Sequence, residues 1–158
     1  MAKPILGYWK IRGLGSGIRY QLAYQGVEYE QVQYEQGDAP DFSNESWLAV
    51  KPTLGFAFPN LPYFIHGDLK MSETMAIQKY IADKWNPELL GKDPETRAQI
   101  NRVAMIFIEW KFKTAIPCYM TGNLEEVLAP NAVYLPKMRE NRGNKKFWAS
   151  EEVSYIDF

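Results

Sequence analysis

Residues 58–83 read FPNLPYFIHGDLKMSETMAIQKYIAD, and this stretch carries the pattern that decides the fold. Two short strands are expected over residues 62–65 and 69–71, because the group His66-Gly67-Asp68 between them favours a tight turn. A helix is expected over residues 74–85, where apolar side chains recur every three or four positions. The segment therefore predicts a β-hairpin that leads directly into an amphipathic helix.

Two features of this segment predict a ligand site. Pro62 stands at the mouth of the first strand, where it cannot donate a ladder hydrogen bond and where its peptide bond can be cis. The backbone next to Pro62 is then left to pair with something else. Ser72-Glu73-Thr74 opens the helix across from it, and free N–H groups at a helix N-terminus favour an anion such as a carboxylate. The combination suggests a site for an extended, charged peptide.

The elements before this segment complete an α/β pattern. Residues 5–9 form a short apolar run, and residues 15–24 place apolar side chains at helical spacing, which predicts a strand followed by a helix. Residues 29–34 alternate and predict a second strand, and Gly37 and Pro40 mark the loop after it. The order is β-α-β, a loop with an irregular helix, and then β-β-α.

The composition changes after Trp85. Residues 86–94 contain Asn86-Pro87 and a second Gly/Pro group, which together predict a linker. From Glu95 a long helix is expected, and a further helix over residues 124–139 is expected to be interrupted by Pro130. The apolar stripe of the long helix comprises Ile100, Val103, Ala104, Phe107, Ile108, Phe112 and Ala115.

The last residues form a variant capping box. Ser154 stands at the N-cap position and Asp157 follows three residues later, so a helix is expected to begin here. The sequence ends at Phe158, one residue after the motif.

Charge and cysteine content exclude several classes of function. Eighteen basic and 19 acidic side chains give a net charge of −1, so neither a nucleic acid nor an anionic membrane is expected as a partner. The single cysteine, Cys118, excludes an internal disulfide, a CxxC pair and a cysteine-based zinc site. No apolar run approaches the roughly 18 residues of a membrane span. We expect a soluble, cytoplasmic protein that binds a small neutral or acidic ligand and no metal.

Two other motifs do not predict catalysis. Residues 13–17, GLGSG, lack the third glycine of a dinucleotide loop and the GK[ST] of a P-loop, so they are expected to form the turn into the next helix. His66 is the only histidine and lies in the predicted hairpin turn without a nucleophile elbow, so a Ser-His-Asp triad is not expected.

Several motifs in the right order resemble one enzyme family. They are Ile5-Leu6-Gly7-Tyr8-Trp9, Ile11-Arg12-Gly13-Leu14, Gly37-Asp38-Ala39-Pro40-Asp41, Trp47-Leu48 and Asn60-Leu61-Pro62-Tyr63. Together they resemble a cytosolic glutathione transferase of the mu class. The resemblance runs from residue 4 to about residue 135 and returns over residues 147–158.

The resemblance implies two domains. Residues 1–86 would form an α/β thioredoxin-like, glutathione-binding N-terminal domain, and residues 87–158 part of an all-α helical C-terminal domain. In the family, the motif at Ser154 opens a central helix that several more follow, so this helical domain is expected to be incomplete. Two alternatives remain open, namely a fragment and a degenerate family member.

The resemblance also implies a catalytic residue. Glutathione transferases need a thiolate at neutral pH, although a free thiol has a pKa of about 8.5. Tyr8 matches the catalytic tyrosine, and its phenol could donate a hydrogen bond to the sulfur from the end of the first strand. The alternative is that Tyr8 is a packing aromatic residue on a buried strand.

Glutathione-binding residues follow from the same matches. The backbone of Leu61 would pair with the cysteinyl part, as an added strand pairs with a sheet edge. Glu73 and Thr74 would hold the γ-glutamyl end, with Glu73 replacing the glutamine usual in mu members. Lys51 would pair with the glycyl carboxylate. The remaining matches are Trp9, Leu14, Trp47, Asn60 and Pro62; for Trp47 and Leu14 the alternative is core packing, and for Lys51 a solvated charge.

Four further matches concern the second domain and the dimer. Tyr119 matches a tyrosine that donates to the electrophile, and Cys118 matches a non-catalytic cysteine. Glu109 stands where the family has an aspartate that reaches the glutathione of the other subunit, and it is one methylene longer. Phe58 matches an aromatic key that inserts into the partner subunit, with a core phenylalanine as the alternative.

The expected function is conjugation of glutathione, as co-substrate, to hydrophobic electrophiles in detoxification. The expected protein is a cytoplasmic homodimer that needs no cofactor. Two alternatives of other classes are a non-catalytic glutathione-binding protein and a structural protein of the same fold.

Overall fold

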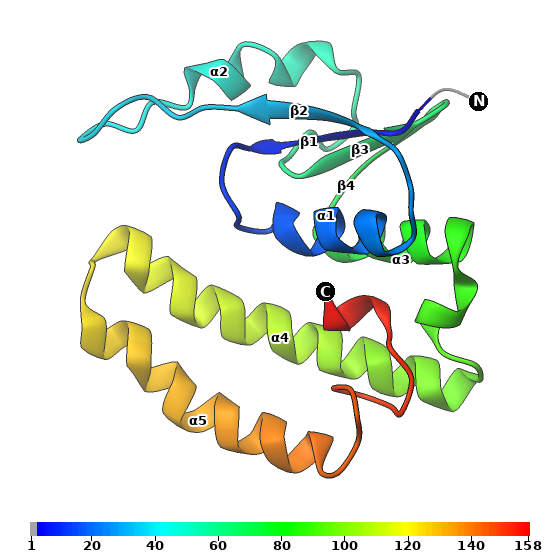
Figure 1. Ribbon diagram of the computed structural model, residues 1–158. Coiled ribbons are helices and arrows are strands. Elements are labelled where there is room, and N and C mark those ends of the chain that lie inside the picture. The colour runs from blue at the N-terminus through cyan, green and yellow to red at the C-terminus, as the bar shows by residue number, and fades with distance from the viewer. Residues whose placement is uncertain (1–2) are drawn as a thin grey trace. The chain divides into compact units, whose positions relative to one another are not determined.

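The computed structural model describes residues 3–158 and divides into two compact units. The first unit ends at Asn86 and also includes Phe158, and the second spans Pro87–Asp157. Figure 1 shows the order of the elements along the chain.

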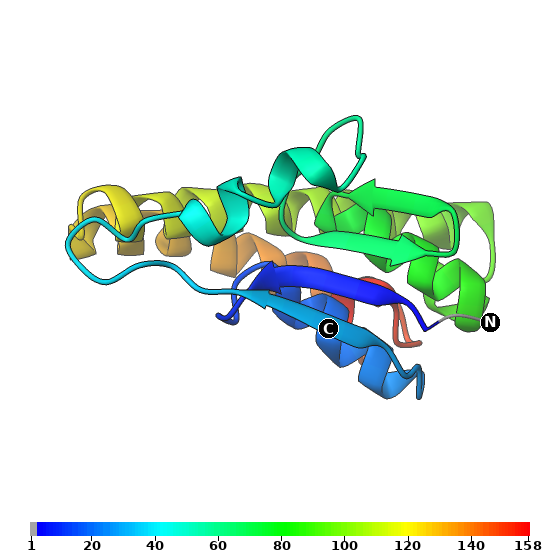
Figure 2. The same ribbon diagram turned by 90° about the horizontal axis from the view of Figure 1, so that it is seen from above.

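The first unit contains a four-stranded mixed sheet. Its strands are β1 (Ile5–Trp9), β2 (Glu30–Tyr34), β3 (Tyr63–His66) and β4 (Leu69–Ser72). The strand order is β2-β1-β3-β4, with β1 parallel to β2 and with β3 antiparallel to both β1 and β4 (Figure 2). The helix α1 (Gly15–Tyr24) connects the parallel pair. This arrangement confirms the predicted thioredoxin-like α/β fold, with strand ends within two residues of those expected.

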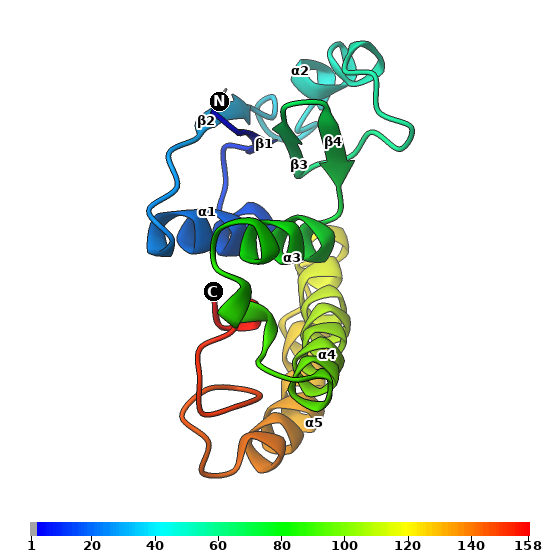
Figure 3. The ribbon, with the colours of Figure 1, turned by 90° about the vertical axis from the view of Figure 1, so that its right-hand side faces the viewer.

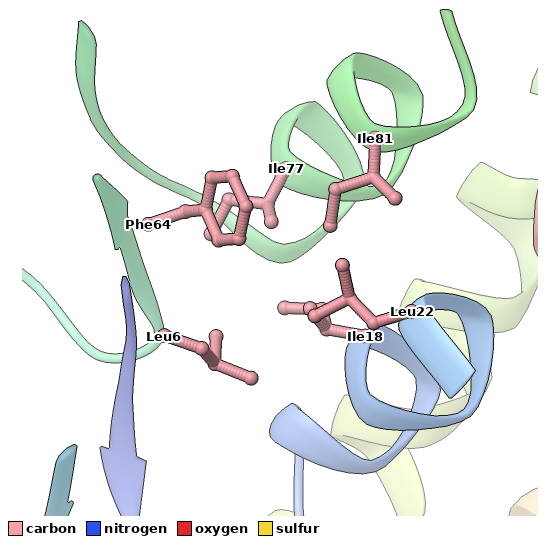
Figure 4. Close-up of a cluster of buried hydrophobic side chains, with 6 residues drawn as sticks. All are labelled: Leu6, Ile18, Leu22, Phe64, Ile77 and Ile81. Carbon is pink, nitrogen blue, oxygen red and sulfur yellow. The ribbon is translucent and has the colours of Figure 1, made fainter. Parts of the chain in front are cut away.

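Helices α1 and α3 (Thr74–Trp85) lie side by side on one face of the sheet (Figure 3). The core between them is fully buried and aliphatic except for one phenylalanine, as Figure 4 shows; it consists of Leu6, Ile18, Leu22, Phe64, Ile77 and Ile81. The buried residues of α3 are Ile77, Gln78, Ile81 and Ala82, whereas Lys84 is exposed.

The other face of the sheet carries the short helix α2 (Glu45–Leu48) and the 3₁₀ turn η1 (Lys51–Thr53) (Figure 1). The buried cluster on this side is aromatic and comprises Tyr8, Tyr34, Trp47, Leu61 and Tyr63. A glycine is required at position 7, since a Cβ there would lie 2.1 Å from ring atoms of Tyr63.

The second unit consists of η2 (Pro87–Leu90), α4 (Pro94–Met120), α5 (Leu124–Arg142) and η3 (Tyr155–Asp157). Asp93 caps α4 by accepting the N–H of Thr96 at 2.7 Å, and Pro94 occupies the first turn, where a missing N–H costs nothing. The helices α4 and α5 run side by side (Figure 1). The buried core of this unit comprises Leu89, Ile100, Val103, Ala104, Met138, Tyr155 and Ile156.

One expectation for the second unit was wrong. Helix α5 continues through both Pro130 and Pro136, although an interruption was expected at Pro130. Local side-chain bonds support the helix there, because the Asn131 amide donates to the Val127 carbonyl at 3.3 Å and accepts the Trp110 indole N–H at 2.8 Å.

The apolar stripe of α4 is buried only in its first half. Ile100, Val103 and Ala104 are buried, whereas Phe112 is exposed. The expectation that a helix begins at Ser154 is confirmed. Asp157 accepts both the backbone N–H and the hydroxyl of Ser154, at 2.9 and 2.8 Å, and the helical turn η3 follows.

Candidate active site

Tyr8 lies in β1 and is held at its phenol oxygen. Its side chain is only 5% exposed, and the oxygen accepts the backbone N–H of Leu14 at 2.8 Å. This bond fixes the hydroxyl against the loop that joins β1 to α1. A bond accepted at a phenol oxygen also polarises its O–H, which strengthens the hydrogen bond that the hydroxyl can donate.

The glycines of the loop make room for this phenol. A Cβ at Gly13 would lie 2.5 Å from the Tyr8 hydroxyl oxygen, and Gly13 has a positive φ of 39°. A Cβ at Gly15 would lie 2.6 Å from the Tyr8 ring. The expectation that this glycine run forms the turn into a helix is confirmed, and the structure adds that it accommodates Tyr8.

Arg19 is part of this arrangement, and sequence reasoning did not find it. Its guanidinium donates to the carbonyls of Ile11 at 2.8 Å and Trp9 at 3.2 Å, and lies 5.7 Å from the centre of the Tyr8 ring. It therefore ties the loop after β1 to α1. The only signal in the sequence is an arginine beside the apolar positions of the predicted helix.

The aromatic cluster brings five of the predicted site residues together. Tyr8, Trp47 and Leu61 are buried members, and Trp9 and Leu14 pack against them while partly exposed. Trp47 stacks on Tyr63 with ring centres 6.1 Å apart. Trp47 is thus a packing residue in the described structure, as the alternative reading stated, and its contact with a ligand stays a prediction.

Within the cluster, two buried tyrosines are bonded to each other. The hydroxyl oxygens of Tyr34 and Tyr63 are 2.9 Å apart. Burial, followed by the bond to Tyr34, raises the pKa of Tyr63 far above its usual range. The Tyr63 phenol therefore stays protonated at neutral pH, and the bonded pair supports Trp47.

The Asn60-Leu61-Pro62 turn precedes β3. The Leu61–Pro62 peptide bond is cis, which the sequence allowed, and Pro62 is fully buried. The N–H of Leu61 is bonded to the Asn60 side-chain oxygen at 2.9 Å. No group within residues 3–158 donates to the Leu61 carbonyl. Of the two backbone groups predicted to pair with a ligand, the Leu61 carbonyl is therefore available, whereas the Leu61 N–H is already bonded to Asn60.

The start of α3 lies beside this turn. Ser72 pairs with Tyr63 in the sheet, so Glu73 and Thr74 follow next to Pro62. Glu73 is the N-cap residue with φ 75° and ψ 110°, a conformation that is costly for a residue with a Cβ. Within the described residues, no side chain caps α3. The first-turn N–H groups of α3 can therefore receive an anion.

Lys51 begins η1, directly after Val50, which packs against the aromatic cluster. Its ammonium forms no ion pair within residues 3–158. The first unit thus presents a buried phenol, a helix N-terminus, a free cation and an open backbone carbonyl around one cluster.

The other predicted residues have these surroundings. Tyr119, near the end of α4, is 78% exposed, and Cys118 beside it is exposed and donates to the Thr114 carbonyl. The Glu109 carboxylate is bonded to Tyr134 at 2.7 Å and to Lys113 at 2.9 Å. Phe58 is 84% exposed, which rules out its reading as a core residue.

The described part of the chain, residues 3–158, contains no group of three or more His, Cys, Asp or Glu side chains that could hold a metal ion. Every helix in it is too short or too polar to cross a membrane.

Residues 4–83 match the sequence model of the family described as "Glutathione S-transferase, N-terminal domain". The chain is 36% identical to a glutathione S-transferase of Dermatophagoides pteronyssinus, over all of this chain and 73% of that protein. It is 38% identical to glutathione S-transferase Mu 2 of Mus musculus, over 97% of this chain and 71% of that protein.

Solved structures give the same result. The glutathione S-transferase Blo t 8 superimposes with a TM-score of 0.76 at 27% identity, over 96% of this chain and 71% of that one. The enzyme from Ascaris lumbricoides superimposes with a TM-score of 0.77 at 23% identity, over 98% and 76%, and at that identity supports the fold alone.

Proposed function

Because the chain belongs to the glutathione S-transferase family, we propose that it conjugates glutathione to hydrophobic electrophiles and that Tyr8 stabilises the thiolate. The observation that carries the proposal is the Tyr8 phenol, which is buried and held by the Leu14 N–H at 2.8 Å. It lies among the residues that would bind glutathione.

In this reaction Tyr8 must lower the pKa of the glutathione thiol. A thiol with a pKa of about 8.5 is mostly protonated at neutral pH, and each unit by which the pKa falls needs about 1.4 kcal/mol. A hydrogen bond donated to a charged group contributes about 1.5–3 kcal/mol. One phenol aimed at the sulfur can therefore lower the thiol pKa by about one to two units, which makes the thiolate a major species near pH 7.

The tripeptide would bind along the turn and the helix start. Its cysteinyl part pairs with the Leu61 backbone as an added strand. Its γ-glutamyl carboxylate meets the first turn of α3 at Thr74, and its amino group pairs with Glu73. Its glycyl carboxylate pairs with Lys51, which has no carboxylate partner of its own in the described residues.

The test is Tyr8→Phe, assayed with glutathione and 1-chloro-2,4-dinitrobenzene and, separately, by calorimetric titration with glutathione. We expect turnover at pH 6.5 to fall about 10- to 50-fold, as a loss of one to two pKa units requires, with glutathione affinity changed much less. Tyr20→Phe, on the exposed face of α1, is the matched control and should match the unaltered protein.

Three results would contradict this proposal in different ways. Equal losses of turnover and affinity in Tyr8→Phe would mean that Tyr8 only binds. Glutathione binding by the unaltered chain without conjugation would favour a non-catalytic binding protein. Absence of both would favour a structural role.

The proposal includes a homodimer in the cytoplasm. Phe58 is 84% exposed, and a large apolar side chain at the surface suits insertion into a second subunit. Light scattering should then give twice the mass of the chain, and Phe58→Ser should shift the protein toward the monomer. Tyr119 is the residue that we assign to the electrophile.

A further inference from the structure

His66, the only histidine of the chain, is the last residue of β3 and is bonded to a tyrosine. Its Nδ1 lies 2.7 Å from the hydroxyl oxygen of Tyr80, which belongs to α3. No carboxylate within residues 3–158 forms an ion pair with the imidazole. The Tyr80 hydroxyl likewise has no second partner in this range. Within the described chain, the phenol and the imidazole are therefore bonded only to each other.

Aromatic rings hold both members of this pair. The centre of the Trp85 ring lies 5.1 Å from that of the imidazole, with 32° between the planes, and 6.2 Å from that of the Tyr80 ring. The fully buried Phe64 lies 6.1 Å from the Tyr80 ring and 6.5 Å from the Trp85 ring, again between centres. Neither Tyr80 nor His66 can turn without disturbing these contacts, so Nδ1 stays directed at the phenol oxygen.

This arrangement contains the parts of an activated nucleophile. Such a nucleophile has a base within about 2.6–3.2 Å, and a third group orients the base. Tyr80 supplies the nucleophilic oxygen, His66 the basic nitrogen and Trp85 the orienting contact. Tyr80 and His66 are only half-buried, so the pair is not enclosed in the core.

We propose that Tyr80 is a modification site, where its phenol oxygen reacts with activated acyl groups and His66 acts as the base. The oxygen attacks the carbonyl carbon and forms a C–O bond, while the phenolic proton passes to Nδ1. This step uses the tautomer in which Nε2 carries the hydrogen. The bond to the leaving group then breaks, and the leaving group departs with its electron pair. The imidazolium gives its proton to the leaving group, and Tyr80 remains as an ester.

This site is separate from the proposed glutathione site. The residues assigned to glutathione around β3 and α3 lie before the strand and at the start of the helix, whereas His66 ends β3 and Trp85 ends α3. Neither His66 nor Tyr80 belongs to the aromatic cluster that contains Tyr8. The reaction at Tyr80 therefore does not depend on conjugation.

The intact chain tests the proposal without a substitution. N-acetylimidazole acetylates phenols, and peptide mass spectrometry measures the rate at each tyrosine. Tyr20 and Tyr24 are internal references, because they are 58% and 56% exposed and their hydroxyls have no partner within residues 3–158. Exposure alone predicts that these two react fastest. We expect Tyr80 to react about tenfold faster than either, because a positioned base accelerates such a step by about 100-fold or more and partial burial offsets some of this gain.

The variant His66→Asn separates the base from the hydrogen bond. The asparagine oxygen can accept the phenol O–H in place of Nδ1 but cannot take its proton at neutral pH. Acetylation at Tyr80 should slow about tenfold, with Tyr20 unchanged. Asp68→Asn, an exposed substitution in the same hairpin turn, is the matched control and should alter neither rate.

Hydroxylamine identifies the bond that forms. It should remove the acetyl group from Tyr80, as it does from a phenol ester, and leave acetylated lysines intact. The proposal is overturned if Tyr80 reacts no faster than the exposed tyrosines, if His66→Asn keeps the full rate at Tyr80, or if the label near Tyr80 resists hydroxylamine.

Discussion

The hydroxyl pair of Tyr34 and Tyr63 gives the sharpest stability prediction. The side chains are 6% and 2% exposed, and their oxygens are 2.9 Å apart. Neither hydroxyl has another partner within residues 3–158. Replacing one tyrosine by phenylalanine therefore leaves the other with a buried hydroxyl that nothing satisfies.

The expected magnitudes follow from this geometry. Each single substitution, Tyr34→Phe or Tyr63→Phe, should lower the free energy of unfolding by about 2 kcal/mol, because an unsatisfied buried polar group costs about 1–3 kcal/mol. The double substitution removes both hydroxyls and keeps both rings, so it should cost about 1 kcal/mol or less. The two effects should thus be strongly non-additive, with a coupling energy of about 3 kcal/mol.

Urea unfolding of the intact chain measures these values. Trp47 stacks on Tyr63, so its fluorescence follows the loss of this cluster. With a urea slope of about 2 kcal/mol/M, each single variant should unfold at a urea concentration lower by about 1 M. The exposed Tyr20→Phe should unfold like the unaltered protein. A double variant as unstable as the sum of its singles would refute the reasoning, since it would show that the hydroxyls do not depend on each other.

Three further predictions concern the loop at Tyr8 and the second unit. Gly13→Ala forces a Cβ to 2.5 Å from the Tyr8 hydroxyl oxygen at a positive φ. The free energy of unfolding, measured by thermal unfolding, should therefore fall by about 1–3 kcal/mol, and conjugation activity should fall with it. A fully active, equally stable variant would contradict this. Asp157→Ala removes the acceptor of both Ser154 bonds and should cost about 1 kcal/mol in urea unfolding, whereas Asp157→Asn should cost less. Burial raises the pKa of Tyr155 from 10 to about 12. The free energy of unfolding should therefore hold its full value below pH 10 and fall as the pH rises from 10 toward 12. Tyr155→Phe should reduce this alkaline fall in stability, which circular dichroism measures.

The sheet and its helices could be predicted because each has a local signal. The turn-forming group at His66 predicted the hairpin, and the spacing of Ile77 and Ile81 predicted α3. No local sequence pattern of this kind marks the packing of one element against another. Helical spacing predicts α3 but does not say that Gln78 and Ala82 are buried beside Ile77 and Ile81.

The second unit shows the limit of local rules. Pro130 removes an N–H and should disfavour a helix, but the bonds that Asn131 makes to Val127 and Trp110 support α5 there. The capping box at Ser154, by contrast, is a local signal, and its hydrogen bonds and the helical turn after it form as expected.

At the candidate site, the residue types could be predicted and their bonding could not. Tyr8 and the turn at Leu61 follow from motifs, whereas the Leu14 bond to Tyr8 depends on how the loop folds back. Arg19 was missed because its contacts are with backbone carbonyls, which every residue carries and which no sequence pattern marks.

The bond between Asn60 and the Leu61 N–H has a consequence for ligand selectivity. A ligand that accepts from this N–H must displace the Asn60 oxygen, so the exchange replaces one hydrogen bond by another and gains little. The Leu61 carbonyl has no donor to give up within residues 3–158, so a ligand N–H that reaches it adds a whole bond. N-methylation of the cysteinyl amide of glutathione should therefore weaken binding more than replacement of the cysteinyl carbonyl oxygen. The N–H and the carbonyl of Leu61, which look equivalent in a strand pairing, would then contribute unequally to ligand binding.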